Sequence, residues 1–361
     1  MAILLVLVHH AVRYGGMQPA VALDRLFQKM GTAGWSGVDL FFVLSGFLIT
    51  GILLDAKGRH GYFRNFYIRR ILRIFPLYYG FLFCAFVVLP HVVTRSAEYS
   101  ALLHDQLWYW TYLQNAAVAL KGWPPVAALD PLWSLAVEEQ FYLVWPLLVL
   151  ALSRRGLIVA CLAIAAASLG IRCVLLLTGH PLGAYVLTPS RMDALSAGGL
   201  LATLARTPGG LSRLARLARP AVAVSSLGLL AIVLWRHNFH YWDWVVRTAG
   251  FSLLAVLFAG ILALVVTSPH NGLTSRFFAH PILRSFGRYS YAMYVFHLPA
   301  LLYLTRFFTA ASVPTLAGSQ LPGQIAVTFA VAGVSLAAAV LSGRFYEAPI
   351  LKLKTLFPYN A

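Results

Sequence analysis

The chain has 361 residues, of which 60% are hydrophobic and 11% are charged, whereas a soluble domain is roughly 45–50% apolar and about 25% charged. So few charges cannot cover a water-soluble surface, and the formal net charge of +17 suits either nucleic-acid binding or the loops of a membrane protein. The basic residues fall in short clusters between long apolar runs, which excludes a nucleic-acid-binding domain and indicates an integral membrane protein.

Apolar runs of about 17–25 residues predict transmembrane helices. We expect an all-α, polytopic bundle of about ten such helices, over residues 1–12, 36–55, 74–93, 132–152, 157–177, 191–205, 220–235, 246–266, 289–308 and 325–345. Basic residues concentrate in alternate connections, above all in residues 57–73 and 206–219. Because Lys and Arg favour the cytoplasmic side, we expect these connections and both chain ends to be cytoplasmic.

The first apolar run ends in two adjacent histidines, His9 and His10. It is shorter than the roughly 20 residues that span a bilayer, so we expect the natural span to begin upstream of Met1. Buried imidazoles need hydrogen-bond partners. A histidine pair at the end of a span favours a general base for one of them over a packing role for both.

The second run contains an acidic residue, Asp39, followed by the small residues Ser45 and Gly46. A charged side chain at the bilayer centre costs at least roughly 2.5–3.5 kcal/mol, which makes Asp39 a functional-site hypothesis. Small residues let a neighbouring helix or a ligand approach closely. Helix packing is the more common role, and a ligand contact for Ser45 is the alternative.

The connection over residues 57–73 alternates basic and aromatic side chains. Arg70 and Arg73 share a helix face because they are three residues apart, and Arg69 lies beside them. Guanidinium groups match phosphate geometry, so this pair could hold the phosphates of a cytoplasmic ligand. From the residues alone, membrane topology with contact to anionic lipids, worth about 1 kcal/mol per basic residue, is the favoured interpretation.

Two adjacent carboxylates, Glu138 and Glu139, lie in the fourth run. Neighbours on a helix point about 100° apart, so each needs its own partner. One carboxylate could raise the basicity of a buried histidine, or both could form salt bridges between helices. The other ionisable residues inside predicted spans include Asp193, His297 and Arg306.

Six segments follow one another in a specific order and spacing: Ala2–His10, Gly37–Ile49, Phe66–Tyr78, Leu132–Tyr142, Arg191–Leu195 and Tyr289–His297. Together they resemble the acyltransferase-3 family, membrane O-acyltransferases that modify bacterial cell-surface glycans and related acceptors. The resemblance covers nearly the whole chain. It implies a transmembrane domain over residues 1–347 in a bacterial inner membrane, with a short cytoplasmic tail over residues 348–361.

The resemblance also implies a reaction. An acyl group, expected to be acetyl, would pass from cytoplasmic acyl-coenzyme A to a hydroxyl of a saccharide or lipid-linked glycan, such as lipopolysaccharide or exopolysaccharide. Acetyl-coenzyme A would be a co-substrate, and we expect neither a metal nor a permanently bound cofactor. Direct transfer and an acyl-histidine relay both remain open. The implied catalytic residues are His10, Glu138, Glu139 and Asp39, and the implied donor-binding residues are Arg70, Arg73, Arg69 and Ser45.

One departure from the family pattern concerns the first helix. The family carries an arginine upstream of the histidine that aligns with His10, and here that position would precede Met1. The chain therefore either begins further upstream or lacks this arginine and its help in placing the donor. Larger family members append an extracytoplasmic domain, and its absence from this sequence leads us to expect direct modification of a small or lipid-linked acceptor.

Two other classes of protein remain as alternatives. In a proton-coupled secondary transporter of envelope precursors, Asp39, Glu138, Glu139 and Asp193 would form a polar pathway. The sequence shows no repeat symmetry of the kind that transporters often have. In a non-catalytic scaffold for envelope assembly, the buried ionisable residues would tolerate neutral substitution.

Overall fold

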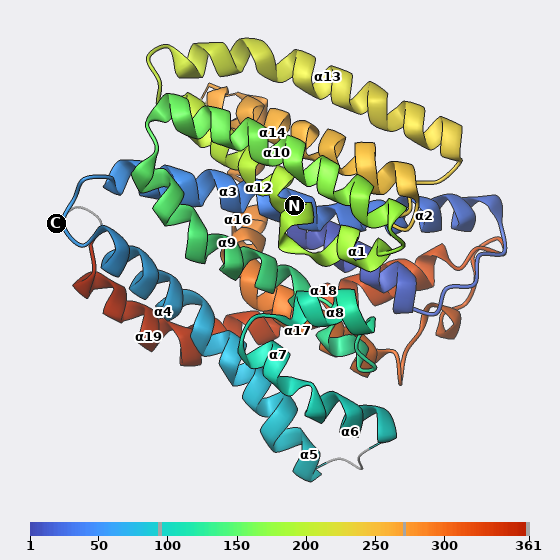
Figure 1. Cartoon of the computed structure of the whole chain (residues 1–361). Helices are drawn as coiled ribbons and strands as arrows, with labels where there is room; N and C mark the ends of the chain where they lie inside the picture. The colour runs from blue at the N-terminus through green and yellow to red at the C-terminus, as the bar shows by residue number, and fades with distance from the viewer. Residues whose placement is uncertain (93–95, 270–271, 359–361) are drawn as a thin grey trace.

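The computed structural model describes residues 1–92, 96–269 and 272–358. Within these ranges the chain forms helices and connecting loops without a strand. The β-type pairing in these ranges is an isolated bridge between Leu316 and Ser319. The expected all-α class is confirmed. Most of the long helices run side by side, and α4 (Tyr62–Phe83) crosses one side of the bundle at an angle (Figure 1).

Seven helical stretches of the described chain are long and apolar enough to cross a membrane: Ala22–Ala56, Tyr62–Val92, Ala127–Ala151, Arg154–Leu177, Gly210–Arg236, Val246–Thr267 and Leu321–Leu356. Helices also occupy the three other predicted runs. Of these, α1 (Ala2–Tyr14) and α17 (Ser290–Leu304) are shorter, and α12 (Thr188–Ala205) carries Arg191 and Asp193. The predicted count of about ten crossings is therefore not confirmed.

The closest helix contact joins α3 (Gly37–Ala56) to α12. A Cβ atom on Gly46 would lie 1.9 Å from the carbonyl oxygen of Leu195, and one on Gly198 would lie 2.0 Å from that of Val43. Both obstacles are backbone atoms, so these positions require glycine. The predicted role of the small residues of α3 in helix packing is confirmed at Gly46.

Outer helices cover this pair. α10 (Arg154–Leu177) packs on α12, and α13 (Gly210–Arg236) packs on α14 (Phe251–Thr267); α13 forms the uppermost layer in Figure 1. Side chains on these outer helices, such as Val159 and Leu227, are exposed although apolar. Such an apolar exterior is what a lipid environment selects.

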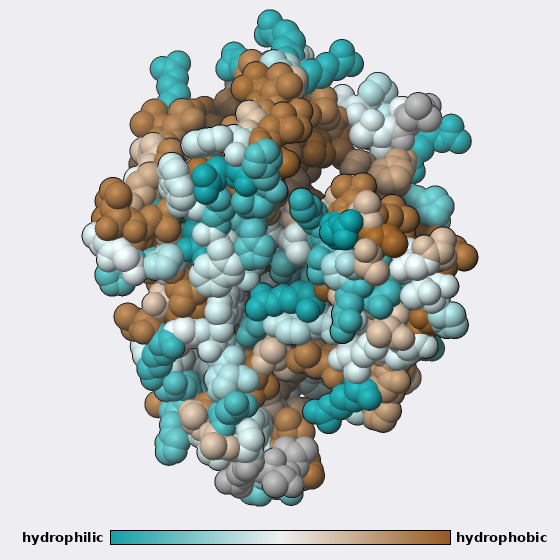
Figure 2. Space-filling model, turned by 90° about the vertical axis from the view of Figure 1, so that its right-hand side faces the viewer, coloured by the Kyte–Doolittle hydropathy of each residue, from teal (hydrophilic) through white to brown (hydrophobic). Residues whose placement is uncertain are grey.

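A second group of helices surrounds α1, which contacts α2 (Ala22–Thr32), α3, α17 and α18 (Leu321–Leu341). α9 (Leu132–Ala151) packs on α3 and carries the two glutamates. The connection before α9 contains the short helices α6 (Ala97–His104), α7 (Gln106–Trp110) and α8 (Gln114–Lys121). The end of the bundle seen in Figure 2 is polar in its middle, with hydrophobic side chains gathered above.

The segment expected to be a tail is folded against α4. It contains α19 (Ala348–Lys352) and the short helix η7 (Leu353–Leu356). The side-chain amide of Asn65 donates to the carbonyl oxygen of Pro358 at 2.7 Å, and Arg69 donates to that of Lys354 at 3.0 Å. The last part of the predicted tail, residues 359–361, lies outside the described residues.

Candidate active site

A pair of histidines lies where α1 meets α17. Nδ1 of His10 is 3.0 Å from the carbonyl oxygen of Val6 and 3.1 Å from Nε2 of His297. His297 is fully buried, and its own Nδ1 lies 2.7 Å from the carbonyl oxygen of Tyr294. Two imidazoles are therefore held in a fixed order between two backbone carbonyls.

This order determines which nitrogen atoms carry protons. Nδ1 of His297 faces a carbonyl oxygen and must be the protonated nitrogen, so Nε2 of the neutral ring is an acceptor. Nδ1 of His10 then donates to Nε2 of His297 and to the carbonyl oxygen of Val6. Nε2 of His10 is left as a bare lone pair, the state that a general base or nucleophile requires.

A cavity of about 30 Å³, which we call the histidine cavity, opens beside this ring. Its polar side chains are His9, His10, Arg13 and Asp130, and its aromatic walls are Trp35, Trp123, Trp133, Tyr185, Tyr241 and Tyr294. The cavity therefore combines charged groups with flat apolar surfaces next to the free nitrogen of His10.

The charged groups at this cavity are loosely held. Arg13 donates to the hydroxyl of Tyr241 at 2.9 Å, and the hydroxyl of Tyr14 donates to Oδ2 of Asp130 at 3.4 Å. Oδ1 of Asp130 is buried and has no hydrogen-bond partner among the described residues. Nearby, His240 stacks on Tyr241, and burial lowers the pKa of His240. Arg13 is thus the positive charge that the lining of this cavity supplies.

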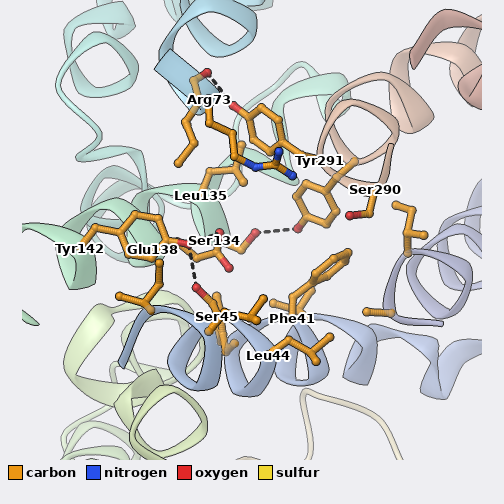
Figure 3. A pocket seen from close by; sticks show the side chains of 18 of the residues that line it. Phe41, Leu44, Ser45, Arg73, Ser134, Leu135, Glu138, Tyr142, Ser290 and Tyr291 are labelled. Atoms are coloured by element: carbon orange, nitrogen blue, oxygen red, sulfur yellow. Dashed lines mark hydrogen bonds between the residues drawn. The ribbon is translucent and has the colours of Figure 1, made fainter. Parts of the chain in front are cut away.

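A larger cavity of about 330 Å³ lies between α3, α4, α9 and α17, and we call it the arginine cavity (Figure 3). Arg73 reaches into it opposite Phe41 and Leu44. The cavity brings together five of the residues that the sequence singled out: Ser45, Arg70, Arg73, Glu138 and Glu139. Arg70 and Arg73 line the same cavity, as their three-residue spacing predicted.

The charges of the arginine cavity are not matched into ion pairs. Among the described residues, neither arginine forms a salt bridge with a carboxylate. The hydroxyl of Tyr142 bridges Ser45, at 2.7 Å from Oγ, and Glu138, to which it donates at 3.5 Å. Cations with free donors can bind an anionic ligand without first breaking an internal bond.

One layer of side chains separates the two cavities. Val38 and Tyr294 line both of them. The Tyr294 hydroxyl lies 2.6 Å from Oγ of Ser134, in the arginine cavity, and donates to the carbonyl oxygen of Pro131, in the histidine cavity, at 3.2 Å. Groups bound in the two cavities would meet at this layer.

Two predicted site residues lie outside both cavities. Asp39 forms a buried ion pair with Arg191 at 2.6 Å, and Arg69 donates to carbonyl oxygens of the C-terminal segment. A second buried pair joins Arg172 to Asp193 at 2.8 Å. Each of these charged groups already has a partner within the protein.

The structure also differs from the expectation that Glu138 or Glu139 orients His10. The glutamates line the other cavity, and His297 holds the imidazole instead. The sequence showed His297 as a buried ionisable residue at the end of a family motif, but gave it no partner. Arg13 and Asp130 were not predicted as site residues. Each borders a loop, where a charged side chain costs little free energy and so does not indicate a functional site.

Comparisons with known proteins identify the family of the chain. The family model described as an acyltransferase domain matches residues 1–344. The O-acetyltransferase OatA of Staphylococcus aureus is 27% identical over 347 residues, which cover 89% of this chain and 53% of the relative. The peptidoglycan O-acetyltransferase OatA of Listeria monocytogenes is 28% identical over 338 residues, 88% of this chain and 51% of the relative.

The chain thus spans about half the length of these curated relatives. No solved structure matches it significantly. The family match runs through α1, with His10, and through the helices that form both cavities. The chain therefore belongs to the acyltransferase-3 family, as its six sequence segments predicted.

Proposed function

We propose that this protein is a membrane O-acetyltransferase that moves an acetyl group from acetyl-coenzyme A to a hydroxyl of a cell-envelope glycan. The observation that carries the proposal is the position of His10. Its free nitrogen borders the histidine cavity, and a single layer of side chains separates that cavity from the arginine cavity. A base beside the acceptor site, one layer of side chains away from the donor site, is what acyl transfer needs.

The proposed reaction uses His10 as a general base. Nε2 takes the proton of the acceptor hydroxyl while the oxygen attacks the carbonyl carbon of the thioester. The carbon–sulfur bond then breaks, and the imidazolium returns its proton to the leaving thiolate, so the neutral base is regenerated. A positioned base contributes about 10²–10⁴-fold to such a rate. His297 supports the step by accepting from the Nδ1–H of His10 and stabilising the cation that forms.

The donor would occupy the arginine cavity. Arg70 and Arg73 offer guanidinium donors without competing carboxylate partners, which favours a phosphate-bearing ligand over simple lipid contact. A volume of about 330 Å³ falls within the range of small-molecule sites, about 300–1,000 Å³. The donor's acyl end would point towards Tyr294 and the layer between the cavities.

The acceptor would present a hydroxyl to the histidine cavity, whose volume of about 30 Å³ suits a group of roughly the size of water. Arg13 and Asp130 can bind hydroxyl or charged substituents there. The names of the relatives point to peptidoglycan as the acceptor class. Lipopolysaccharide and exopolysaccharide are the other glycans that the sequence led us to consider.

The test uses purified protein in lipid nanodiscs with labelled acetyl-coenzyme A and a soluble peptidoglycan fragment. We expect release of coenzyme A that depends on the acceptor, with label recovered on the glycan. His10→Gln should lower the rate about 100-fold or more. His9→Gln is the matched control, since His9 lines the same cavity but bonds to the carbonyl oxygen of Thr32, and it should lose less than about tenfold by the same reasoning.

Two results would overturn the proposal. An unchanged rate in His10→Gln would remove the base from the mechanism. Uptake of the glycan fragment into vesicles, without consumption of acetyl-coenzyme A and with loss in Glu138→Gln, would establish the transporter alternative instead.

A further inference from the structure

A third cavity, of about 430 Å³, shares Arg73 with the arginine cavity. It is bounded by α4, by the junction of α16 (Pro281–Arg288) with α17, and by the π-helical segment η6 (Ser342–Glu347) with the start of α19. We call it the C-terminal cavity. None of the residues assigned a role in the sequence lines it except Arg73.

The lining of the C-terminal cavity is strongly basic. Arg73, Arg288 and Arg344 contribute guanidinium groups, and Glu347 contributes a carboxylate. Among the described residues, none of the three arginines forms an ion pair within 4.0 Å. Glu347 accepts instead from the hydroxyl of Ser342 at 3.1 Å. The cavity thus has three guanidinium groups and a single carboxylate, which already accepts a hydrogen bond. This excess of positive charge favours a ligand with more than one negative charge.

The walls of this cavity are fixed by contacts between distant parts of the chain. The hydroxyl of Tyr346 in η6 donates to the carbonyl oxygen of Pro76 in α4 at 2.9 Å. Gly343 lies so close to Tyr289 that an added Cβ would be 3.0 Å from a ring carbon. Single π-helical turns within helices are frequent at functional sites. The cavity is therefore a built feature of the C-terminal segment.

The C-terminal cavity is continuous in its lining with the arginine cavity. Arg73 and Tyr291 line both. Tyr291 is held in place by donating to the carbonyl oxygen of Ile74 at 3.0 Å, one residue after Arg73. A ligand that bound Arg73 from both sides would extend from one cavity into the other.

We propose that the C-terminal cavity binds the 3′-phosphate and the adenosine end of the acyl donor, through Arg288 and Arg344, while Arg70 and Arg73 hold the diphosphate where the donor's arm enters the arginine cavity. This proposal rests on the proposed function. The volume exceeds what a single phosphate needs, guanidinium groups bind phosphate oxygens in pairs, and Tyr289 offers a ring on which an adenine base can stack. The shared chemistry, a phosphate ester, also occurs in anionic lipid headgroups.

The test measures binding of adenosine 3′,5′-bisphosphate, a probe without acyl arm, to full-length protein in nanodiscs of zwitterionic lipid. We expect the double variant Arg288→Gln/Arg344→Gln to bind it at least about tenfold more weakly, which corresponds to about 1.4 kcal/mol. The double variant Arg288→Lys/Arg344→Lys keeps the charges but loses the planar guanidinium groups. Its affinity for the probe should lie between that of the wild type and that of the glutamine double variant. Arg284→Gln is the control, since Arg284 is exposed on α16 but does not line the cavity.

A second arm repeats the measurement with vesicles containing phosphatidylglycerol. If the glutamine double variant loses retention of the anionic lipid but binds the nucleotide as tightly as the wild type, the site is a lipid site and the proposal is wrong. If Arg284→Gln weakens nucleotide binding as much as the double variant, the effect is general surface charge, which also contradicts it. Nucleotide binding that is lost in the double variant, in a protein that transfers no acetyl group, would leave this site standing while the proposed function fails.

Discussion

Charged side chains are held differently in two regions of this molecule. Around α12, two buried arginines have carboxylate partners: Arg191 pairs with Asp39, and Arg172 pairs with Asp193. Around α4 and α9, Arg70, Arg73, Glu138 and Glu139 share a cavity without forming an ion pair among the described residues. In the first region the arginines are paired with carboxylates of the protein, whereas in the second region the charged groups are available to a ligand.

We infer that the paired charges stabilise the packing of the helices and that the unpaired charges serve the candidate site. A buried pair is weak evidence for net stability, but removing one partner is strongly destabilising because the other charge is left uncompensated. Partly exposed charges beside a cavity, without an ion-pair partner, are available to a ligand or a reaction. Substitutions in the α12 region should therefore affect folding, and substitutions at the cavities should affect turnover.

The largest expected effect comes from Asp39→Ala. It leaves Arg191 buried without its partner and should lower the free energy of unfolding by about 3–5 kcal/mol, as measured by unfolding in detergent. Asp55→Ala is the control, because the carboxylate of Asp55 is 62% exposed in its pair with Arg206 and an exposed pair is worth about 0–1 kcal/mol. Equal stability of the two variants would mean that the buried pair is not structural.

The next effect comes from His297→Leu. The Nδ1–H of His10 then keeps only the carbonyl oxygen of Val6 as an acceptor, so the His10 ring is less firmly oriented. We expect about a 10- to 100-fold lower rate, equivalent to about 1.4–2.7 kcal/mol, with the KM for acetyl-coenzyme A unchanged. His297→Gln, which can present an amide oxygen to His10, should lose less. Identical rates for both variants would show that orientation through His297 is irrelevant.

Glu139→Gln distinguishes a donor-site role from a catalytic one. At a pH where Glu139 is ionised, glutamine in its place removes a negative charge from the arginine cavity. This should lower the KM for the polyanionic donor about two- to fivefold, because like charges repel, while kcat stays within about twofold. Steady-state kinetics at several salt concentrations provide the measurement, and screening should shrink the difference. A loss of kcat of about 100-fold with constant KM would instead support the sequence-based expectation that this carboxylate takes part in catalysis.

The smallest effect is expected for Ser45→Ala. The variant loses the 2.7 Å hydrogen bond to the Tyr142 hydroxyl, which should reduce stability by about 0.5–1.5 kcal/mol. We expect the KM for the donor to change less than about twofold, since one neutral hydroxyl contributes little beside two guanidinium groups. A tenfold increase in KM, with unchanged stability, would show that Ser45 binds the donor directly.

The sequence predicted the helices well because apolar runs mark them directly. It also predicted that Arg70 and Arg73 share a face, since three-residue spacing is a local property of a helix. It could not predict that Asp39 meets Arg191, because these residues come from different helices and only packing brings them together. Arg69 was grouped with its neighbours, yet it donates to the C-terminal segment, whose packing against α4 the sequence did not predict.

In the candidate site, too, the sequence indicated individual residues but not the contacts between helices. His10 was identified through its family motif, and the expensive burial of His297 was visible, but their 3.1 Å contact depends on how α1 packs against α17. The glutamates were expected near His10 because they were the available carboxylates. The packing of α9 against α3 and α4 turns them towards the arginine cavity instead.

The most direct test of His10 as the base is chemical rescue of His10→Gly. The variant removes the ring at a cost of about 1 kcal/mol for glycine within a helix, and the space left beside the histidine cavity can admit free imidazole. We predict that acceptor-dependent release of coenzyme A falls about 100-fold or more and rises again with the concentration of neutral imidazole. A variant that releases coenzyme A at the wild-type rate without imidazole would contradict the account.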